Sequence, residues 1–312
     1  MYQVITIGSA LIDVFIRSSN FIIKSHKEGD LLCQLFGSKY SIDDLNVCTG
    51  GGASNAAVGY TRLGFKSAII CETGKDHFSS IVVQKLNNET VITDFIIKEK
   101  KEQTGGSVIL VGDDGRRTIM VHRGAAAMLD PYDVPGYRLS QSQWIHLSSI
   151  GGNLKTLKKI FSIVKKDENI GLTWNPGSKE LQLLAKQQLK IKNISCKIFI
   201  LNKEEWHSIK NVQKDIFKHC KTVVVTAGSE GGIVYINGEL KLEFEGNKVK
   251  AVDATGAGDA FSVGLTSALM LKKPLVEAVE WGRENAKSVI SYFGAKAGLL
   301  TKEKMEYLRG NK

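Results

Sequence analysis

Short aliphatic and β-branched runs alternate with helical patterns over most of the chain, and this alternation restricts the fold more than any other feature. Runs of strand length lie at residues 3–7, 67–71, 144–147, 198–201 and 222–225. Helical patterns lie between them, at residues 53–63, 79–86, 154–165, 179–189 and 203–220. Alternating strands and helices are typical of a mostly parallel sheet covered by helices on both faces. The sequence therefore predicts an α/β fold with a three-layer α/β/α core.

Two β-rich segments interrupt this alternation. Residues 14–47 contain short alternating pieces such as LLCQLF, and residues 95–122 read as a hairpin around positions 112–117. We expect the two segments to pair into a small β-sheet lid that closes over a substrate and excludes water. The core then comprises residues 1–13, 48–94 and 123–312, and the lid comprises residues 14–47 and 95–122.

Composition excludes several classes of protein. With 312 residues and 43% hydrophobic content, the chain can build one large core. No apolar run is long enough to span a bilayer, and the N-terminus MYQVITIGSALID lacks the pattern of a secretory signal. The five cysteines are scattered without a CxxC pair, which predicts reduced thiols and a cytoplasmic location.

The net charge of +10 raises the question of nucleic-acid binding. Residues 155–221 hold fifteen Lys and only six acidic residues. These lysines are spaced along predicted helices, without an Arg cluster or interleaved aromatic residues. That spacing favours a solvated surface over a nucleic-acid site.

The stretch VDATGAGDAFSVGL places small residues and one carboxylate before an apolar helix. Small residues let a ligand approach the backbone closely, and the free N–H groups of a helix N-terminus bind anions. Asp259 has two interpretations here: a helix cap, or a base that accepts a proton during phosphoryl transfer. The stretch fits neither the GxGxxG dinucleotide pattern nor a Walker A loop.

A second glycine cluster, GGGASNAA, opens the helical pattern at residue 53 and places Asn55 in its first turn. Asn55 is polar in an otherwise small and apolar segment. It can bind a substrate hydroxyl, or it can form a local backbone hydrogen bond as a cap. Both interpretations stand at this point.

Together, GGGASNAAVGYTRLG and VDATGAGDAFSVGL resemble the ribokinase-like (PfkB) carbohydrate kinases. GSALID at the start, LNKEE and TAGSEGG agree in order and separation, so the resemblance covers nearly the whole chain. It implies the ribokinase-like fold and an ATP-dependent kinase. Asp259 would be the catalytic base, and an anion hole would be formed by Gly256, Ala257 and Gly258.

The resemblance also implies an acceptor site. Asp13 would grip substrate hydroxyls, and Gly51, Gly52 and Asn55 would form a second contacting segment. Gly52 stands where ribokinases proper often carry Lys, which weakens the case for ribose itself. Arg123 either faces the sugar or lies on the surface.

On the nucleotide side, Asn202 and Glu205 match an NxxE element that organises Mg²⁺ through water, although the same pair also reads as an N-cap and its N3 partner. The remaining family positions are Thr226, Gly228 and Gly231 in a nucleotide loop, Asn285 near adenine, and Asp253 and Thr255, which in several members help to hold a monovalent cation such as K⁺.

The function expected from these patterns is transfer of the γ-phosphoryl group of ATP to a primary hydroxyl of a sugar or sugar-like molecule, with Mg²⁺. One alternative is a nucleoside kinase of the same fold, with Phe15, Phe21 or Phe36 of the lid against the base. Another is a catalytically silent ligand or nucleic-acid binder. A homodimer through the lid sheet is the expected assembly.

Overall fold

The computed structural model describes residues 2–99, 101–112, 116–249 and 251–310. Its main sheet has nine strands in the order β15 (Glu239–Phe244), β14 (Gly232–Ile236), β13 (Cys220–Thr226), β12 (Cys196–Asn202), β11 (Gly171–Trp174), β10 (Ser142–Leu147), β1 (Tyr2–Ile7), β6 (Ser67–Gly74) and β7 (Ile92–Glu99). Neighbours from β13 to β7 pair in parallel, while β14 and β15 form an antiparallel hairpin at one edge.

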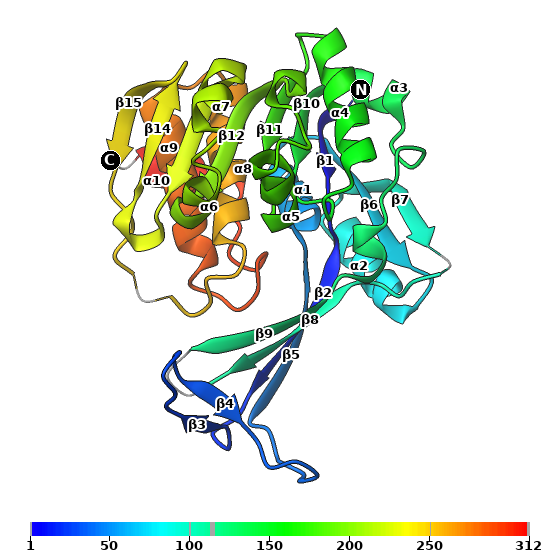
Figure 1. Ribbon diagram of the computed structural model, residues 1–312, viewed down its shortest axis with the longest axis vertical. Coiled ribbons are helices and arrows are strands. Elements are labelled where there is room, and N and C mark those ends of the chain that lie inside the picture. The colour runs from blue at the N-terminus through cyan, green and yellow to red at the C-terminus, as the bar shows by residue number, and fades with distance from the viewer. Residues whose placement is uncertain (1, 100, 113–115, 250, 311–312) are drawn as a thin grey trace.

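Helices cover both faces of this sheet (Figure 1). One layer contains α1 (Gly52–Arg62), α2 (His77–Asn88), α8 (Ala257–Met270), α9 (Leu275–Val289) and α10 (Lys302–Gly310). The other contains α3 (Gly136–Ser140), α4 (Leu154–Lys166), α5 (Ser178–Ala185), α6 (Lys203–Ser208) and α7 (Gln213–His219). Along β1, Ile5 and Ile7 join one core cluster and Val4 the other. Burial on both faces explains why the central strands are almost continuously apolar, and the predicted three-layer core is confirmed.

A second sheet projects from one end of the core (Figure 1). Its strand order is β5 (Asp44–Gly50), β2 (Leu11–Arg17), β8 (Gly106–Val111) and β9 (Arg117–His122), with a short pair of β3 (Ile22–Lys24) and β4 (Leu31–Cys33) beside it. Val14 of the first β-rich segment pairs with Val108 of the second, as predicted. The predicted hairpin forms between β8 and β9, and positions 113–115 at its tip lie outside the described residues.

The structure corrects one predicted lid boundary. Residue 95 belongs to the core, because Phe95 in β7 pairs with Ile70 of β6 and packs against the main hydrophobic cluster. The second piece of the lid sheet therefore begins at Gly106. The lid strands also extend further inward than predicted, since β2 begins at Leu11 and β5 ends at Gly50.

Two element predictions were wrong in detail. The single helix expected over residues 203–220 is two helices, α6 and α7. Between them Ile209, Asn211 and Val212 combine low helix propensity with a hydrogen bond from Asn211 Nδ2 to the Ala185 carbonyl. The β14–β15 hairpin was missed, although its Asn237–Gly238 turn, with φ of 52° and 81°, is a strong hairpin signal.

Within the described ranges, the helices are all too short or too polar to cross a bilayer. Three single-turn 3₁₀ helices complete the fold: Gly124–Ala127, Ile191–Asn193 and Gly228–Glu230.

Candidate active site

The strand order reverses beside β1, which lies between β10 on one side and β6 on the other. In parallel sheets such a reversal opens a crevice at the carboxyl ends of the strands, where ligands bind. Ser9 follows β1, Ser148 follows β10 and Asn175 follows β11, and all three line a cavity of about 290 Å³. We call it the acceptor cavity.

The first turn of α8 forms one wall of the acceptor cavity. Its N-cap, Gly256, has a φ of 78°, and a Cβ at this position would lie 2.3 Å from the Ala295 Cβ. Glycine is therefore required here by both conformation and space. Among the described residues, no acceptor pairs with the amides of Gly258 and Asp259. Unpaired amides at a helix N-terminus attract anions.

The carboxylate of Asp259 faces the acceptor cavity from the same turn. Asn55 Nδ2 donates a hydrogen bond of 2.7 Å to Asp259 Oδ2. Burial raises the pKa of Asp259, while the bond from Asn55 and the nearby charge of Lys296 lower it. Asp259 is thus a carboxylate that lines the cavity and has a fixed orientation, as a general base requires.

Asn55 does not cap α1, because the N-cap is Gly51 and no side chain bonds there. Its amide nitrogen instead orients Asp259, and its buried Oδ1 has no partner within the described part of the chain. A buried acceptor without a partner is costly unless a ligand supplies a donor. Since Asn55 lines the acceptor cavity, its Oδ1 is available to a substrate hydroxyl.

Asp13 reaches the same cavity from the lid strand β2. It is 7% exposed, and its Oδ1 accepts a hydrogen bond from Ser107 Oγ of β8. Burial raises the pKa of Asp13, against the lowering effects of Ser107 and Lys296. Gly51, Gly52 and Arg123 also line the cavity, so the structure brings the predicted acceptor residues together. Gly51, with a φ of 93°, lies against the Ser9 carbonyl, where a Cβ would approach within 2.5 Å.

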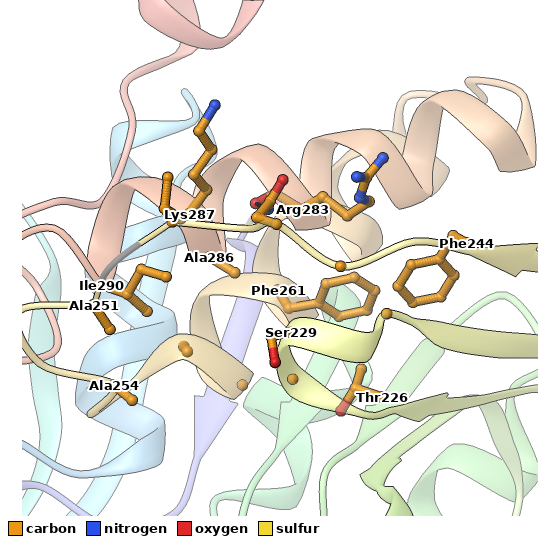
Figure 2. Close-up of a pocket in the computed structure, with 17 residues that line it drawn as sticks. Thr226, Ser229, Phe244, Ala251, Ala254, Phe261, Arg283, Ala286, Lys287 and Ile290 are labelled. Carbon is orange, nitrogen blue, oxygen red and sulfur yellow. Dashed lines mark hydrogen bonds between the residues drawn. The ribbon is translucent and has the colours of Figure 1, made fainter.

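A second cavity of about 260 Å³ adjoins the Gly256–Asp259 turn, with Ala257 and Gly258 in its lining. Figure 2 shows this cavity. Thr226, Gly228 and Gly231, the three residues expected on the nucleotide side, line it together. Figure 2 shows the rings of Phe244 and Phe261 side by side at one end of the cavity. Their centroids are 5.6 Å apart and their planes differ by 13°. The lining is mainly apolar, which suits a flat heterocycle. We call it the nucleotide cavity.

The helix turn is shared by the two cavities. Ala257 and Gly258 line the nucleotide cavity, whereas Gly256 and Asp259 line the acceptor cavity. The unpaired amides of Gly258 and Asp259 therefore lie at the boundary between the two cavities. A chemical group could be transferred there from a ligand in one cavity to a ligand in the other.

The structure corrects the role predicted for Asn285. It is fully buried, donates from Nδ2 to the Ala260 carbonyl at 2.8 Å and accepts from the Leu300 amide at 3.0 Å. It joins α9 to α8 and does not line the nucleotide cavity. Its neighbours Ala286 and Lys287 do, because the helix turns their side chains towards the opening.

Asn202 and Glu205 form a reciprocal capping box at the start of α6. Asn202 Oδ1 accepts from the Glu205 amide, and Glu205 Oε2 accepts from the Asn202 amide, both at 2.8 Å. Burial raises the pKa of Glu205. Within the described residues Glu205 Oε1 has no hydrogen-bond partner. One free carboxylate oxygen fits a Mg²⁺ ion that keeps most of its water.

Asp253, which was expected to help hold a monovalent cation, already has both carboxylate oxygens occupied by hydrogen-bond donors. Its Oδ1 accepts from the amide and hydroxyl of Thr255, at 2.9 and 2.7 Å, and from Arg117 Nη1 of the lid. Its Oδ2 accepts from the Gly294 amide at 3.0 Å. The Arg117 guanidinium already pairs with this carboxylate. The side chains present therefore do not fit a K⁺ ion at Asp253.

Several residues that line the acceptor cavity were missed by sequence reasoning, among them Ser9, Ser148 and Asn175. Lys296, whose charge acts on Asp259, was missed as well. Ser148 and Asn175 stand directly after β10 and β11, and Ser9 stands two residues after β1, so their positions at the carboxyl ends of strands could have identified them. Lys296 follows α9 in a chain rich in lysine, and no sequence signal separates it from the surface lysines.

Known proteins resemble the chain in sequence and fold. The family model described as pfkB family carbohydrate kinase matches residues 1–302. A fructokinase of Escherichia coli is 30% identical over 243 residues, which are 71% of this chain and 77% of the relative. The nucleoside kinase of Methanocaldococcus jannaschii, described as an archaeal member of the ribokinase family, has a TM-score of 0.80 at 22% identity, covering 99% of both chains.

An Escherichia coli chain provisionally named Ribokinase II, solved in complex with ATP and Mg²⁺, has a TM-score of 0.81 at 19% identity and covers 100% of both chains. At these identities the solved structures establish the ribokinase-like fold. The family match over nearly the whole sequence goes further: this chain belongs to the pfkB family of carbohydrate kinases, which are phosphotransferases.

Proposed function

We propose that the protein transfers the γ-phosphoryl group of ATP to a primary hydroxyl of a sugar or sugar-like molecule. One observation carries this proposal: a single helix turn with unpaired amides separates the nucleotide cavity from an acceptor cavity that contains a fixed carboxylate. Such an arrangement holds donor and acceptor on opposite sides of the group that moves.

In the proposed mechanism, Asp259 accepts the proton of the acceptor hydroxyl while that oxygen bonds to the γ-phosphorus. The bond from phosphorus to the bridging oxygen breaks, and ADP leaves. The amides of Gly258 and Asp259 stabilise negative charge on the phosphoryl oxygens by fixed dipoles. A Mg²⁺ ion near Glu205 would supply charge neutralisation on the phosphates. Asp13 and Asn55 hold the acceptor in position.

The lining of the acceptor cavity favours a sugar over a nucleoside. Serine, asparagine and aspartate dominate it, and no aromatic side chain from the described residues lines it. Phe15 is buried against Phe293, with centroids 6.3 Å apart, and Phe36 is fully exposed on the lid. Neither is placed to stack on a base. The similarity to a fructokinase points the same way.

A panel of acceptors with ATP and Mg²⁺ tests the substrate class. We expect turnover of one or more sugars or sugar acids and none of adenosine or inosine. Turnover of nucleosides alone would instead favour the nucleoside kinase. Binding of ATP without turnover of any acceptor would favour a silent binder.

Substitution of Asp259 tests the mechanism. We expect Asp259→Asn to fold and to bind ATP, but to lose at least about a hundredfold in kcat, as is typical for a removed general base. Asp94→Asn, at an exposed position of β7, is the matched control and should retain full activity. Full activity of Asp259→Asn would refute the proposed mechanism.

We also propose that the protein forms a homodimer through the lid sheet. All of β9 is exposed at an edge of the lid sheet, with Ile119, Met120 and Val121 each about half exposed, which is consistent with a homodimer through this edge. Sedimentation of the wild type and of Met120→Lys tests the dimer. We also propose a cytoplasmic location, which the five unpaired cysteines support.

A further inference from the structure

The carboxylate of Asp253 is a buried junction between three segments of the chain. Its Oδ1 accepts from the amide and the hydroxyl of Thr255, at 2.9 and 2.7 Å, and its Oδ2 accepts from the Gly294 amide at 3.0 Å. The third segment is the lid, from which Arg117 Nη1 donates to Oδ1. The Asp253 side chain is only 3% exposed, so its charge is largely removed from water.

A buried carboxylate needs more than neutral hydrogen-bond donors. Removing its charge from water is costly, and that cost is offset only where an opposite charge and further hydrogen bonds are present. Within the described residues, Arg117 is the one cationic group that pairs with Asp253. Arg117 is the first residue of β9, at the edge of the lid sheet, and 136 positions separate it from Asp253. The lid therefore supplies the counter-ion of a carboxylate that belongs to the core.

Asp253 lies at the entrance to the turn that carries the unpaired amides. Thr255, which donates to Asp253, lines the acceptor cavity and is followed by Gly256, the N-cap of α8. Gly294, the other backbone donor, is followed by Ala295, which packs against Gly256. Both backbone segments that bind the Asp253 carboxylate thus continue into the same turn. A change in the charge or position of that carboxylate acts on the turn.

The lid side of the ion pair continues to Asp13 of the acceptor cavity. Arg117 of β9 pairs with Val111 of β8, and Ser107 of the same strand donates to Asp13 Oδ1. An unbroken series of hydrogen-bonded neighbours therefore joins the acceptor side of the lid to the Gly256–Asp259 turn.

We propose that Arg117 is a positioning residue, which neutralises Asp253 and so couples the position of the lid to phosphate binding at the Gly256–Asp259 turn. The inference rests on the proposed function, because it assumes that this turn binds the phosphates of ATP. A lid position that breaks the ion pair leaves the Asp253 charge unpaired beside the turn, where it repels the phosphates. The coupling is reciprocal, so bound ATP favours the lid position in which the ion pair forms.

Calorimetric titration with Mg²⁺–ATP tests this role through the charge of Asp253. It needs no acceptor, and it is done without K⁺ or Na⁺ so that no small cation replaces the guanidinium. Arg117→Met should raise the Kd about tenfold or more, because it leaves a buried carboxylate unpaired. Asp253→Asn removes the charge but keeps an oxygen that can accept from Thr255, so its Kd should stay near the wild-type value. In the Asp253→Asn protein, Arg117→Met should then have no further effect on the Kd.

Two further variants separate charge from packing. Arg117→Lys supplies the same charge and should keep most of the wild-type affinity, because one guanidinium nitrogen makes the contact with Asp253. Arg116→Met is the matched control, since Arg116 is the neighbouring residue and pairs with Asp30 of the lid at 2.6 Å. It should leave the Kd unchanged. Wild-type affinity in Arg117→Met would overturn the inference. So would a tenfold rise in Kd on adding Arg117→Met to Asp253→Asn, because the effect would then not depend on the carboxylate.

Hydrogen exchange tests the coupling from the lid side, again without an acceptor. Exchange in β8 and β9 should slow when Mg²⁺–ATP binds to the wild type, and saturating Mg²⁺–ATP should not slow it in Arg117→Met. Equal rates in the wild type with and without Mg²⁺–ATP would refute the coupling. If Arg117→Met fails to fold, the Asp253→Asn background decides: equal Kd values with and without Arg117→Met support the inference, and unequal values refute it. Failure of the proposed function is seen separately, as full activity of Asp259→Asn.

Discussion

Two glycines of one helix turn, Gly256 and Gly258, are predicted to respond in opposite ways to the same substitution. Gly256 has a φ of 78°, and an added Cβ would lie 2.3 Å from the Ala295 Cβ. A left-handed conformation costs an alanine roughly 1–2 kcal/mol, and overpacking adds roughly 1–3 kcal/mol. Gly256→Ala should therefore lower the free energy of unfolding by about 2–5 kcal/mol.

That loss can be converted to a melting temperature. The entropy of unfolding near 60 °C is about 2.1 cal/mol/K per residue, or roughly 0.65 kcal/mol/K for a chain of 312 residues. The Tm of Gly256→Ala should thus fall by about 3–8 °C.

Gly258 has no atom within 4 Å of an added Cβ, and it lies inside the first turn of α8. Alanine is favoured over glycine in a helix by roughly 0.5–1 kcal/mol, so Gly258→Ala should keep or slightly raise the Tm. Its methyl group, however, would occupy the open space beside the unpaired amides. Losing one charge-assisted hydrogen bond of about 1.5–3 kcal/mol should raise the Kd for ATP by about 10- to 100-fold.

Differential scanning fluorimetry and calorimetric titration with Mg²⁺–ATP measure the two effects without an acceptor. Wild-type affinity in Gly258→Ala would refute the conclusion that this turn holds phosphate. Wild-type stability in Gly256→Ala would refute the inference that the positive φ and the close contact with Ala295 require glycine at position 256.

Three further predictions follow from other parts of the structure. Glu72 is buried in β6, and burial raises its pKa from 4.5 to about 8. The free-energy cost of ionising Glu72 in the folded state grows as pH rises through that range, so Glu72→Gln should stabilise the protein by roughly 4–5 kcal/mol at pH 8.5 and hardly at pH 4, as measured by urea unfolding. Because Arg117 pairs with Asp253, the wild type should not require K⁺, whereas Arg117→Met should become K⁺-stimulated; a K⁺ requirement in the wild type contradicts this. Hydrogen exchange in residues 14–47 should slow when a sugar acceptor binds, and equal rates with and without it would count against a closing lid.

Much of the fold could be predicted because central strands such as β6 and β13 are buried on both faces and helices such as α4 bury one apolar face. Residues 67–71 and 222–225 are continuous apolar runs that can only be central strands in such a pattern. The predicted start of the second lid segment at residue 95 was wrong because a strand-length apolar run does not reveal which sheet it joins. In β7 the run ITDFIIKE looks like the lid segments, and only its pairing with β6 assigns it to the core.

The site was predictable wherever a motif fixes backbone geometry. Gly256 and Gly51 have positive φ, and such positions leave a visible glycine in the sequence. Roles that depend on the direction of a side chain were harder to predict from the sequence. Asn285 and Lys287 lie two positions apart on α9, yet one bonds inside the core and the other lines the nucleotide cavity. Asn55 was expected to contact substrate, and its bond to Asp259 joins residues 204 positions apart.

The boundary between the two cavities, only one helix turn thick, has a kinetic consequence. Neither Ala257 nor Gly258 carries a nucleophile, and in the proposed mechanism Asp259 acts as a base and does not store a phosphoryl group between two half-reactions. Both ligands must therefore occupy the enzyme together, and initial-rate plots against either one should intersect rather than run parallel. A chiral phosphorothioate passed across this turn in one displacement would arrive with its configuration inverted.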